Sequence, residues 1–297
     1  MIFRYIFFSL YKKINSKGFL LINIYNYKML IPMQYDGIGR ALYVYGSREL
    51  DHKWMLTEEL FPGNVVLDLG ANIGYYAIME AKIVGSSGKI YAIEPDPRNI
   101  EFLKKNIKLN NIDGIFDLEE GAISNEDKKT EFILSPKTNL SSFDLDKSKN
   151  NLNSILVQTH NIGSFLKNKK RVDLIRMDIE GHEIEVFESL VEFSKNFKNY
   201  LPRKIIFETH LGVYKKKKEY ARNTFEKLFS AGYVIKYFSS SNEPKEVLRK
   251  KGLYPFKIIK DYPFKRGIYK NLNSKDFIYF ATETGGLRTV LLELKKE

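Results

Sequence analysis

Carboxylates and glycines stand at the ends of two predicted strands, where a bound ligand could reach them. The segment Asp68-Leu-Gly70-Ala-Asn72-Ile-Gly74 closes the apolar run Val65–Leu69. Glycines at a strand-to-helix turn let a ligand approach the backbone, whose free N–H groups then face it. Glu94 ends the next apolar run, 26 residues after Asp68. A carboxylate there can accept hydrogen bonds from both hydroxyls of a ribose, so the pattern predicts a nucleoside-containing cofactor at the carboxyl ends of parallel strands.

Two classes of cofactor suit such a loop. A dinucleotide site requires G-x-G-x-x-G, and counting from Gly70 this chain has Asn72 and Tyr75 at the other two glycine positions. An NAD-binding oxidoreductase is therefore disfavoured. The run instead resembles the D-x-G-x-x-x-G motif of class I methyltransferases, in which the loop wraps the amino-acid end of S-adenosylmethionine. With that resemblance, the expected cofactor-binding residues are Asp68, Gly70, Asn72, Gly74, Glu94, Ala122 and Asp178.

Three segments, in order along the chain, narrow the resemblance. Leu69–Tyr76, Arg176–Glu183 with its Asp-x-Glu-Gly element, and Phe207–His210 are similar to the FkbM family of methyltransferases, over roughly residues 40–283. The resemblance implies an α/β, Rossmann-like class I fold, with a seven-stranded, mostly parallel sheet, helices on both faces and an antiparallel last strand. It also implies O-methylation, commonly of hydroxyls on sugars or natural products.

Two positions depart from the family pattern. Arg176 stands where the family usually has lysine, and Gly163-Ser164 aligns with its usual pair of aspartates. Any polar contact that the aspartate pair makes in the family is therefore in doubt for this chain.

The Asp-x-Glu-Gly element places two carboxylates where a predicted strand becomes a helix, and His210 ends a neighbouring strand. Methyl transfer to a hydroxyl must align the two partners and remove the hydroxyl proton. A carboxylate or a neutral imidazole can take that proton. We therefore predict a catalytic site formed by Asp178, Glu180 and His210, with the base left open among them. The alternatives are structural: acids placed at a helix N-terminus for its dipole, and a histidine at the rim of the site.

A metal is the other alternative at this site. Asp178, Glu180 and Glu208 could supply the hard oxygen ligands that Mg²⁺ prefers, and some class I O-methyltransferases hold Mg²⁺ in this way. We predict a site without a metal.

The order of elements supports the fold. From Val65 onward, apolar runs alternate with amphipathic helical segments, which is typical of a parallel sheet covered on both faces. The later strands are expected at Phe116–Glu119, Asp173–Met177, Lys204–Glu208, Val234–Phe238 and Phe277–Ala281.

The same pattern divides the chain. Residues 1–60 are expected to form an N-terminal extension with a short apolar helix, small strands and a helix leading into the catalytic domain, and residues 61–284 to form that domain. A Ser-, Asn- and Lys-rich insert at 135–154 lies on the surface, either as a lid over a site or as an uninvolved loop. Residues 285–297 are expected to be a C-terminal tail.

Composition narrows the class of function. Lys and Arg total 48 against 36 acids, a net charge of +12, and such an excess suits an anionic partner. Lysine is spread along the whole chain without a basic stripe interleaved with aromatics, so we expect a small-molecule or glycan acceptor and regard nucleic acid as unlikely. The absence of cysteine excludes disulfides and cysteine nucleophiles and suits the cytoplasm.

The chain begins with the apolar segment Met1–Tyr11, followed by Lys12-Lys13. Eleven residues are too few to span a bilayer, and a signal peptide would carry its charge first. Residues 1–17 could instead form a helix that lies on a membrane surface, or a helix docked on the protein itself.

Two other functions remain open. A ribose-hydroxyl methylase of nucleic acid fits the net charge, although the chain lacks the Pro-Pro element and the cysteine that base methylation commonly uses. A catalytically inactive binding module of the same fold is the second.

Overall fold

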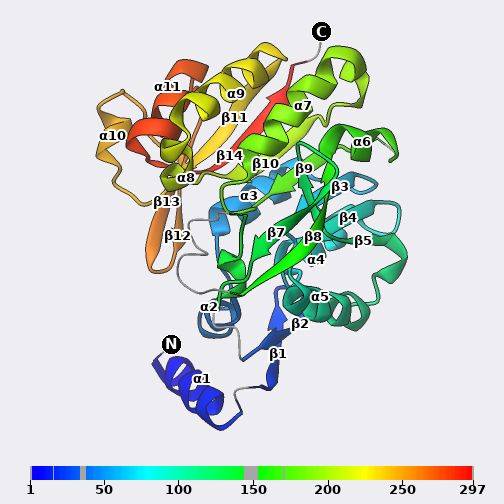
Figure 1. The fold of residues 1–297 in the computed structure, drawn as a ribbon. Coiled ribbons are helices and arrows are strands. Elements are labelled where there is room, and N and C mark those ends of the chain that lie inside the picture. The colour runs from blue at the N-terminus through cyan, green and yellow to red at the C-terminus, as the bar shows by residue number, and fades with distance from the viewer. Residues whose placement is uncertain (1, 16, 34–37, 144–152, 170, 296–297) are drawn as a thin grey trace.

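A nine-stranded sheet runs through the centre of the protein (Figure 1). The computed structural model describes residues 2–15, 17–33, 38–143, 153–169 and 171–295. In the order in which they lie side by side, the strands are β12 (Lys257–Asp261), β13 (Phe264–Tyr269), β11 (Tyr233–Ser240), β14 (Leu287–Leu294), β10 (Lys204–Glu208), β9 (Leu174–Met177), β3 (Val65–Leu69), β4 (Lys89–Glu94) and β5 (Phe116–Glu120).

Seven of these strands form the sheet that the sequence predicts. β10, β9, β3, β4 and β5 pair in parallel, and β14 runs antiparallel to both β10 and β11. The hairpin β12–β13 extends this sheet beyond β11. The central strands are buried on both faces, which is why they read as almost continuous apolar runs in the sequence.

The predicted position of the last strand is wrong. Residues 277–281 are helical, because α11 (Ser274–Tyr279) continues into a π-helical turn, η5 (Phe280–Thr284). The buried side chains there recur at helical spacing: Phe277, Phe280 and Ala281. The last strand is β14, which lies inside the sheet and comes from residues that were expected to form a tail. Gly285 and Gly286 have positive φ and turn the chain from the helix into β14.

Helices cover both faces of the sheet, so the protein has three layers (Figure 1). One apolar cluster packs the sheet against α3 (Leu50–Glu59), α4 (Tyr75–Val84) and α5 (Pro97–Leu109). The other packs it against α6 (Ile162–Lys167), α7 (Glu183–Phe197), α8 (Leu211–Lys216), α9 (Lys218–Ser230), α10 (Glu246–Arg249) and α11.

The N-terminal elements pack against the α3–α5 side. They are α1 (Ile2–Ile14), the hairpin β1 (Phe19–Ile24) and β2 (Tyr27–Pro32), and α2 (Ile38–Tyr45). Asn106 of α5 fixes β2 by exchanging hydrogen bonds with the backbone of Leu30, at 2.7 and 3.1 Å. Among the described residues, none of the helices is both long and apolar enough to cross a membrane.

A small sheet lies beside the carboxyl ends of the central strands. Its strands are β6 (Ala122–Ser124), β8 (Ser154–Asn161) and β7 (Lys128–Ile133), in that order. Short helices complete the fold: η1 (Asp113–Ile115), η2 (Thr138–Leu140) and η4 (Lys198–Tyr200). The predicted insert begins after β7, and residues 144–152 of it lie outside the described residues.

Candidate active site

A buried carboxylate lies at the carboxyl end of β4. The Oε2 atom of Glu94 accepts a hydrogen bond from the backbone N–H of Asn72 at 2.8 Å. Its Oε1 atom accepts from the backbone N–H of Asp96 at 3.0 Å and from Nδ2 of Asn99 at 3.1 Å. Burial nevertheless raises the pKa of Glu94 to about 7, because desolvation disfavours the charged form.

Glu94 lies in a pocket with mostly apolar walls, here called the Glu94 pocket. It is lined by Leu69, Gly70, Asn72, Ile93, Pro95, Asn99, Gly121, Ala122, Ile123, Phe132, Asp178, Ile179, Glu180 and His182, among others. The Oδ1 atom of Asn99 is buried and has no hydrogen-bond partner among the described residues. A nucleoside fits these residues. The oxygens of Glu94 and Asn99 can accept hydrogen bonds from its hydroxyls, while the apolar walls hold its base.

Part of the predicted insert forms a wall of the Glu94 pocket. Thr138, Ser141 and Phe143 line the pocket, and the Ser141 hydroxyl donates to Oδ2 of Asp96 at 3.1 Å. Three described residues of the insert thus line the pocket, which favours a role at the site over an uninvolved loop.

Arg176 is the central cation of the site. Its Nη1 atom lies 3.0 Å from Oδ1 of Asp68 and donates to the carbonyl of Gly70 at 3.0 Å. Its Nη2 atom lies 3.1 Å from Oδ2 of Asp178, and the guanidinium carbon is 4.4 Å from the centre of the Tyr76 ring. The planar fork of arginine serves three acceptors at once, which the single ammonium of a lysine does less well.

Two of the predicted cofactor-binding residues, Asp68 and Gly74, are not among the residues that line the Glu94 pocket. Asp68 is fully buried beneath the loop and acts on it through Arg176. Gly74 begins α4 with a φ of 96°, and a side chain there would come within 2.8 Å of Leu103. The structure thus gives both residues a role in shaping the loop.

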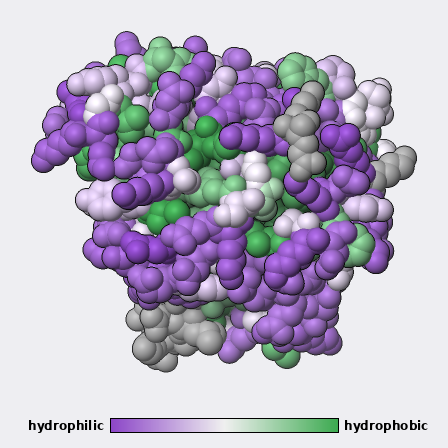
Figure 2. Space-filling view, turned by 90° about the horizontal axis from the view of Figure 1, so that it is seen from above, coloured by the Kyte–Doolittle hydropathy of each residue, from purple (hydrophilic) through white to green (hydrophobic). Residues whose placement is uncertain are grey.

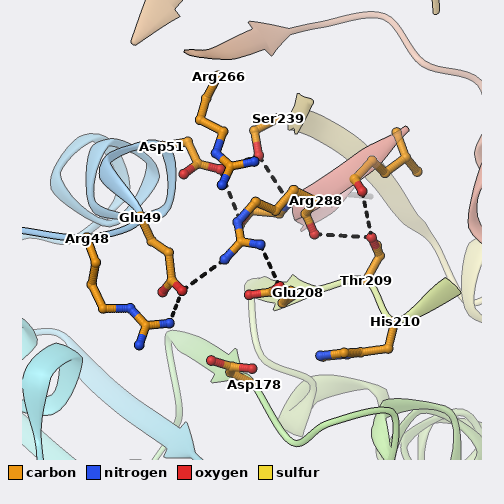
Figure 3. A network of polar contacts seen from close by, with 12 residues as sticks. Arg48, Glu49, Asp51, Asp178, Glu208, Thr209, His210, Ser239, Arg266 and Arg288 are labelled. Atoms are coloured by element: carbon orange, nitrogen blue, oxygen red, sulfur yellow. Dashed lines mark hydrogen bonds and ion pairs between the residues drawn. The ribbon is translucent and has the colours of Figure 1, made fainter. Parts of the chain in front are cut away.

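A second cavity, of about 320 Å³, adjoins the Glu94 pocket and is here called the Arg288 cavity. The two share Gly70, Asn72, Asp178 and Glu180. Its charged lining residues are Arg48, Glu49, Arg176, Asp178, Glu180, Glu208, His210 and Arg288. Acids and bases therefore alternate around one polar space, several of them shown in Figure 3.

Arg288 holds the upper part of this network together (Figure 3). Its Nη2 atom lies 2.9 Å from Oε1 of Glu49, and its Nη1 atom lies 2.8 Å from Oε1 of Glu208. Arg48 binds the same oxygen of Glu49, whose other oxygen accepts from the Tyr76 hydroxyl at 2.9 Å. Burial raises the pKa of Glu208 to about 8, with Asp178 and Glu49 adding to the rise and Arg288 opposing it.

The three predicted catalytic residues lie together. Carboxylate oxygens of Asp178 and Glu180 and a ring nitrogen of His210 all lie within 4.8 Å of one another. Asp178 and Glu180 line both cavities, whereas His210 lines only the Arg288 cavity. Glu180 has a positive φ of 56°, a strained conformation for a non-glycine residue that is common at functional sites.

The charges around His210 favour its protonated form. Its Nδ1 atom lies 3.2 Å from Oε1 of Glu183, but it is not directed along a hydrogen bond, so the contact is an ion pair. Burial alone would lower the pKa of His210, yet Glu183, Glu208 and Asp178 raise it to about 10. The raised pKa favours the imidazolium at neutral pH, a form that donates a proton rather than accepting one.

Carboxylates that could ligate a metal also converge here. Asp178, Glu180 and His210 form one such group, and Glu49, Asp178 and Glu208 form another. Guanidinium groups already balance several of these charges, since Asp178 contacts Arg176, and Glu49 and Glu208 contact Arg288.

Sequence reasoning missed the residues that complete the Arg288 cavity. Arg48 and Glu49 precede α3 in the predicted N-terminal extension, and Arg288 lies in the predicted C-terminal tail. A strand pattern in Leu287–Leu294, had it been recognised, would have brought Arg288 to the sheet. His182 also lines the Glu94 pocket, with its Nε2 atom 2.9 Å from the Ser124 hydroxyl.

Known proteins are similar to parts of this chain. Residues 68–235 match the family model of the methyltransferase FkbM domain. A probable cobalt-precorrin-6B C(15)-methyltransferase from Sulfolobus acidocaldarius is 41% identical over 49 residues, 16% of this chain and 26% of that protein. Methyltransferase 1 from Beauveria bassiana is 25% identical over 146 residues, 42% of this chain and 57% of that protein. In the first three curated relatives, the region that matches this chain makes up about a quarter of the relative's own length.

Solved structures are similar at lower identity. The FkbM methyltransferase from Methylobacillus flagellatus is 12% identical, with a TM-score of 0.41, over 78% of this chain and 65% of that one. The fibrillarin of Aeropyrum pernix, solved with S-adenosylmethionine, is 12% identical, with a TM-score of 0.38, over 91% and 84%.

The order of the seven strands, with an antiparallel strand inside the sheet, and the loop beside Glu94 define a class I, Rossmann-like methyltransferase. The family match covers more than half of the chain, so the protein belongs to the FkbM methyltransferase family, and its cofactor is S-adenosylmethionine.

Proposed function

We propose that this enzyme methylates a hydroxyl oxygen of a sugar, a glycan or a similar natural product. The observation that carries the proposal is the Arg288 cavity, which adjoins the Glu94 pocket and is lined by four acids and four bases. Its volume of about 320 Å³ suits a small acceptor. Paired charges at fixed positions can donate to and accept from the several hydroxyls of such a molecule.

The Glu94 pocket is the proposed cofactor site. Bound there, S-adenosylmethionine supplies a methyl group on a positively charged sulfur. Glu94 accepts hydrogen bonds from the ribose hydroxyls, and Asn72, Gly70 and Ala122 contact the cofactor along the wall. Arg48 lies beyond Asn72 in the Arg288 cavity and can balance the carboxylate of the amino-acid end.

Glu180 is the base in this proposal. It lines both cavities and so stands where the acceptor hydroxyl meets the methyl group. Asp178 lines both cavities as well, and the contact of its Oδ2 atom with Arg176 makes it part of the network that holds the cofactor loop. The acceptor oxygen forms the new bond to the methyl carbon, the carbon–sulfur bond breaks with its electron pair left on sulfur, and the hydroxyl proton passes to Glu180. Glu208 and the cationic His210 orient the acceptor.

The test is methyl transfer from radiolabelled S-adenosylmethionine to a panel of sugars, glycans and natural-product alcohols, with unmodified RNA alongside. We expect a methyl ether on a member of the hydroxylic panel, identified by mass spectrometry. Transfer to RNA ribose alone would replace this proposal with the nucleic-acid alternative. Cofactor binding without transfer to any member would favour an inactive binding module.

A further inference from the structure

Helix α1 exposes an apolar stripe. Phe3, Leu10 and Ile14 are 88%, 54% and 86% exposed, and with Phe7 they recur at a spacing that places them on one face of a helix. α1 docks on the protein through Phe8, which is buried with its ring 5.7 Å from the ring of Tyr43, and through Phe7, whose ring lies 6.0 Å from the same ring. Docking therefore accounts for Phe8 and in part for Phe7, and it leaves Phe3, Leu10 and Ile14 exposed.

Positive charge surrounds this stripe. At 3.6 residues per turn, Arg4 and Lys13 lie on opposite flanks of it. Residues 1–35 contain five basic residues and no acidic one: Arg4, Lys12, Lys13, Lys17 and Lys28. The strand that follows α1 adds two exposed apolar side chains, Phe19 and Leu21.

The tip of the β12–β13 hairpin lies beside α1 and has the same character. A groove lined by Arg4, Tyr45, Lys260 and Tyr262, among others, joins the two segments, and the rings of Tyr45 and Tyr262 are 5.3 Å apart. The hairpin segment 257–265 exposes three apolar side chains, those of Ile258, Tyr262 and Phe264, and three lysines, Lys257, Lys260 and Lys265, whereas its one acid, Asp261, is buried.

We propose that α1 and the tip of the β12–β13 hairpin form a docking surface for an anionic lipid bilayer. The apolar stripe enters the boundary between headgroups and acyl chains while the flanking lysines bind anionic headgroups. α1 lies at one end of the molecule (Figure 1), whereas hydrophilic side chains cover most of the face seen from the opposite side (Figure 2). A second copy of the chain fits this surface less well, because two surfaces without compensating acids in residues 1–35 would repel each other.

This surface is connected to the active site by one short helix. α2 begins at Ile38, which lines the Arg288 cavity, and ends at Tyr45, which lines the groove beside α1. An eight-residue helix is about 12 Å long. The docked enzyme thus holds its second cavity near the lipid surface, and the docking itself does not depend on which acceptor is methylated.

The experiment is co-sedimentation of the full-length protein with vesicles of phosphatidylcholine alone and of phosphatidylcholine with phosphatidylglycerol. We expect binding to the anionic vesicles that weakens with added salt. A Phe3→Ser, Leu10→Ser, Ile14→Ser variant should bind at least about a hundredfold more weakly, because three apolar side chains are removed. A Lys13→Glu, Lys17→Glu variant should lose about thirtyfold or more.

Two control variants make the same kinds of substitution at exposed positions away from the proposed docking surface. Leu156→Ser removes an apolar side chain that is 73% exposed on β8, and Lys227→Glu with Lys295→Glu reverses two exposed lysines on α9 and after β14. Both should bind vesicles like the wild type. Calorimetry with S-adenosylmethionine verifies that every variant is folded.

Three results would overturn the proposal. The wild-type protein could stay in the supernatant with anionic vesicles, or the triple serine variant could bind as tightly as the wild type. Light scattering could also find a dimer that the triple variant converts to a monomer, which would make a second copy the occupant of the surface.

Discussion

The affinity for S-adenosylmethionine should depend on pH through Glu94. This carboxylate must be ionised to accept hydrogen bonds from both ribose hydroxyls, and burial raises its pKa to about 7. The ionised fraction grows as the pH rises, so binding should strengthen through pH 7 and level off above it. The direction of this pH dependence is opposite to that of a site in which a protonated histidine binds the ligand, where affinity would fall as the pH rises.

The magnitude follows from a single ionisation. If the cofactor binds only the ionised form, the apparent Kd is multiplied by one plus ten to the power of pKa minus pH. The factor is about 1.1 at pH 8, about 2 at pH 7 and about 11 at pH 6. The loss between pH 8 and pH 6 is therefore about tenfold, or about 1.4 kcal/mol.

Isothermal titration calorimetry of the wild type and two variants measures this effect. Glu94→Gln should bind about tenfold or more weakly at pH 8, because charge-assisted hydrogen bonds are lost, and its affinity should lack the tenfold step. The variant shares every other titration, including that of the amino group of the ligand. Glu208→Gln is the matched control, since it removes a partly buried carboxylate that lines the Arg288 cavity but not the Glu94 pocket, and it should keep the step.

A Glu94→Gln variant with the wild-type pH profile would refute this reasoning, because the titrating group would then lie elsewhere. A wild-type affinity that stays constant from pH 6 to pH 8 would show that the protonated carboxyl binds ribose equally well.

The remaining predictions concern the charged network and catalysis. Arg176→Met should lower the free energy of unfolding, measured in urea, by about 3–5 kcal/mol, because it leaves the charges of Asp68 and Asp178 uncompensated. Arg176→Lys keeps the positive charge and should lower this free energy by less. An equal decrease in both variants would show that the shape of the side chain matters rather than its charge. Glu180→Gln should lower turnover by about 10²–10⁴-fold with unchanged cofactor affinity; full turnover on a genuine acceptor would remove Glu180 as the base. The pKa of His210 is raised from about 6.5 in the unfolded chain to about 10 in the folded protein, so the stability that its charge contributes is complete below pH 6.5 and is lost as the pH rises through about 10. The difference in unfolding free energy between the wild type and His210→Gln should therefore shrink from pH 6 to pH 10. A constant difference would contradict the ion pair. A chelator should leave turnover unchanged, whereas loss of turnover that Mg²⁺ restores would establish a metal site.

The cofactor half of the site could be predicted from the sequence because its parts are local. Asp68–Gly74 and Glu94 each follow an apolar run, and parallel strands bring their carboxyl ends to one edge of a sheet. The same rule placed Asp178, Glu180 and His210 together, and the structure brings them within 4.8 Å of one another.

The fold class and most strands of the seven-stranded sheet were predicted correctly, whereas the β12–β13 hairpin and the small β6–β8–β7 sheet were not predicted. The position of the last strand was wrong because an apolar run there has two interpretations. Phe277–Ala281 is short and apolar, and periodicity alone does not separate a strand from a buried helix at that length. Packing decides between them: the ring of Phe277 lies 5.0 Å from that of Phe225 on α9. Because the last strand was assigned to Phe277–Ala281, the residues of β14, including Arg288, were assigned to the C-terminal tail.

The sequence by itself therefore determined the fold class, the cofactor loop and the order of the strand-end carboxylates, since each depends on neighbours in the chain. Only the tertiary structure decided the second cavity and its charges. Arg288 meets Glu49 across 239 residues of sequence, a separation at which no periodicity carries information. The protonation of His210 likewise depends on Glu183 and on burial, because the pKa of a buried group is set by the charges that folding places around it.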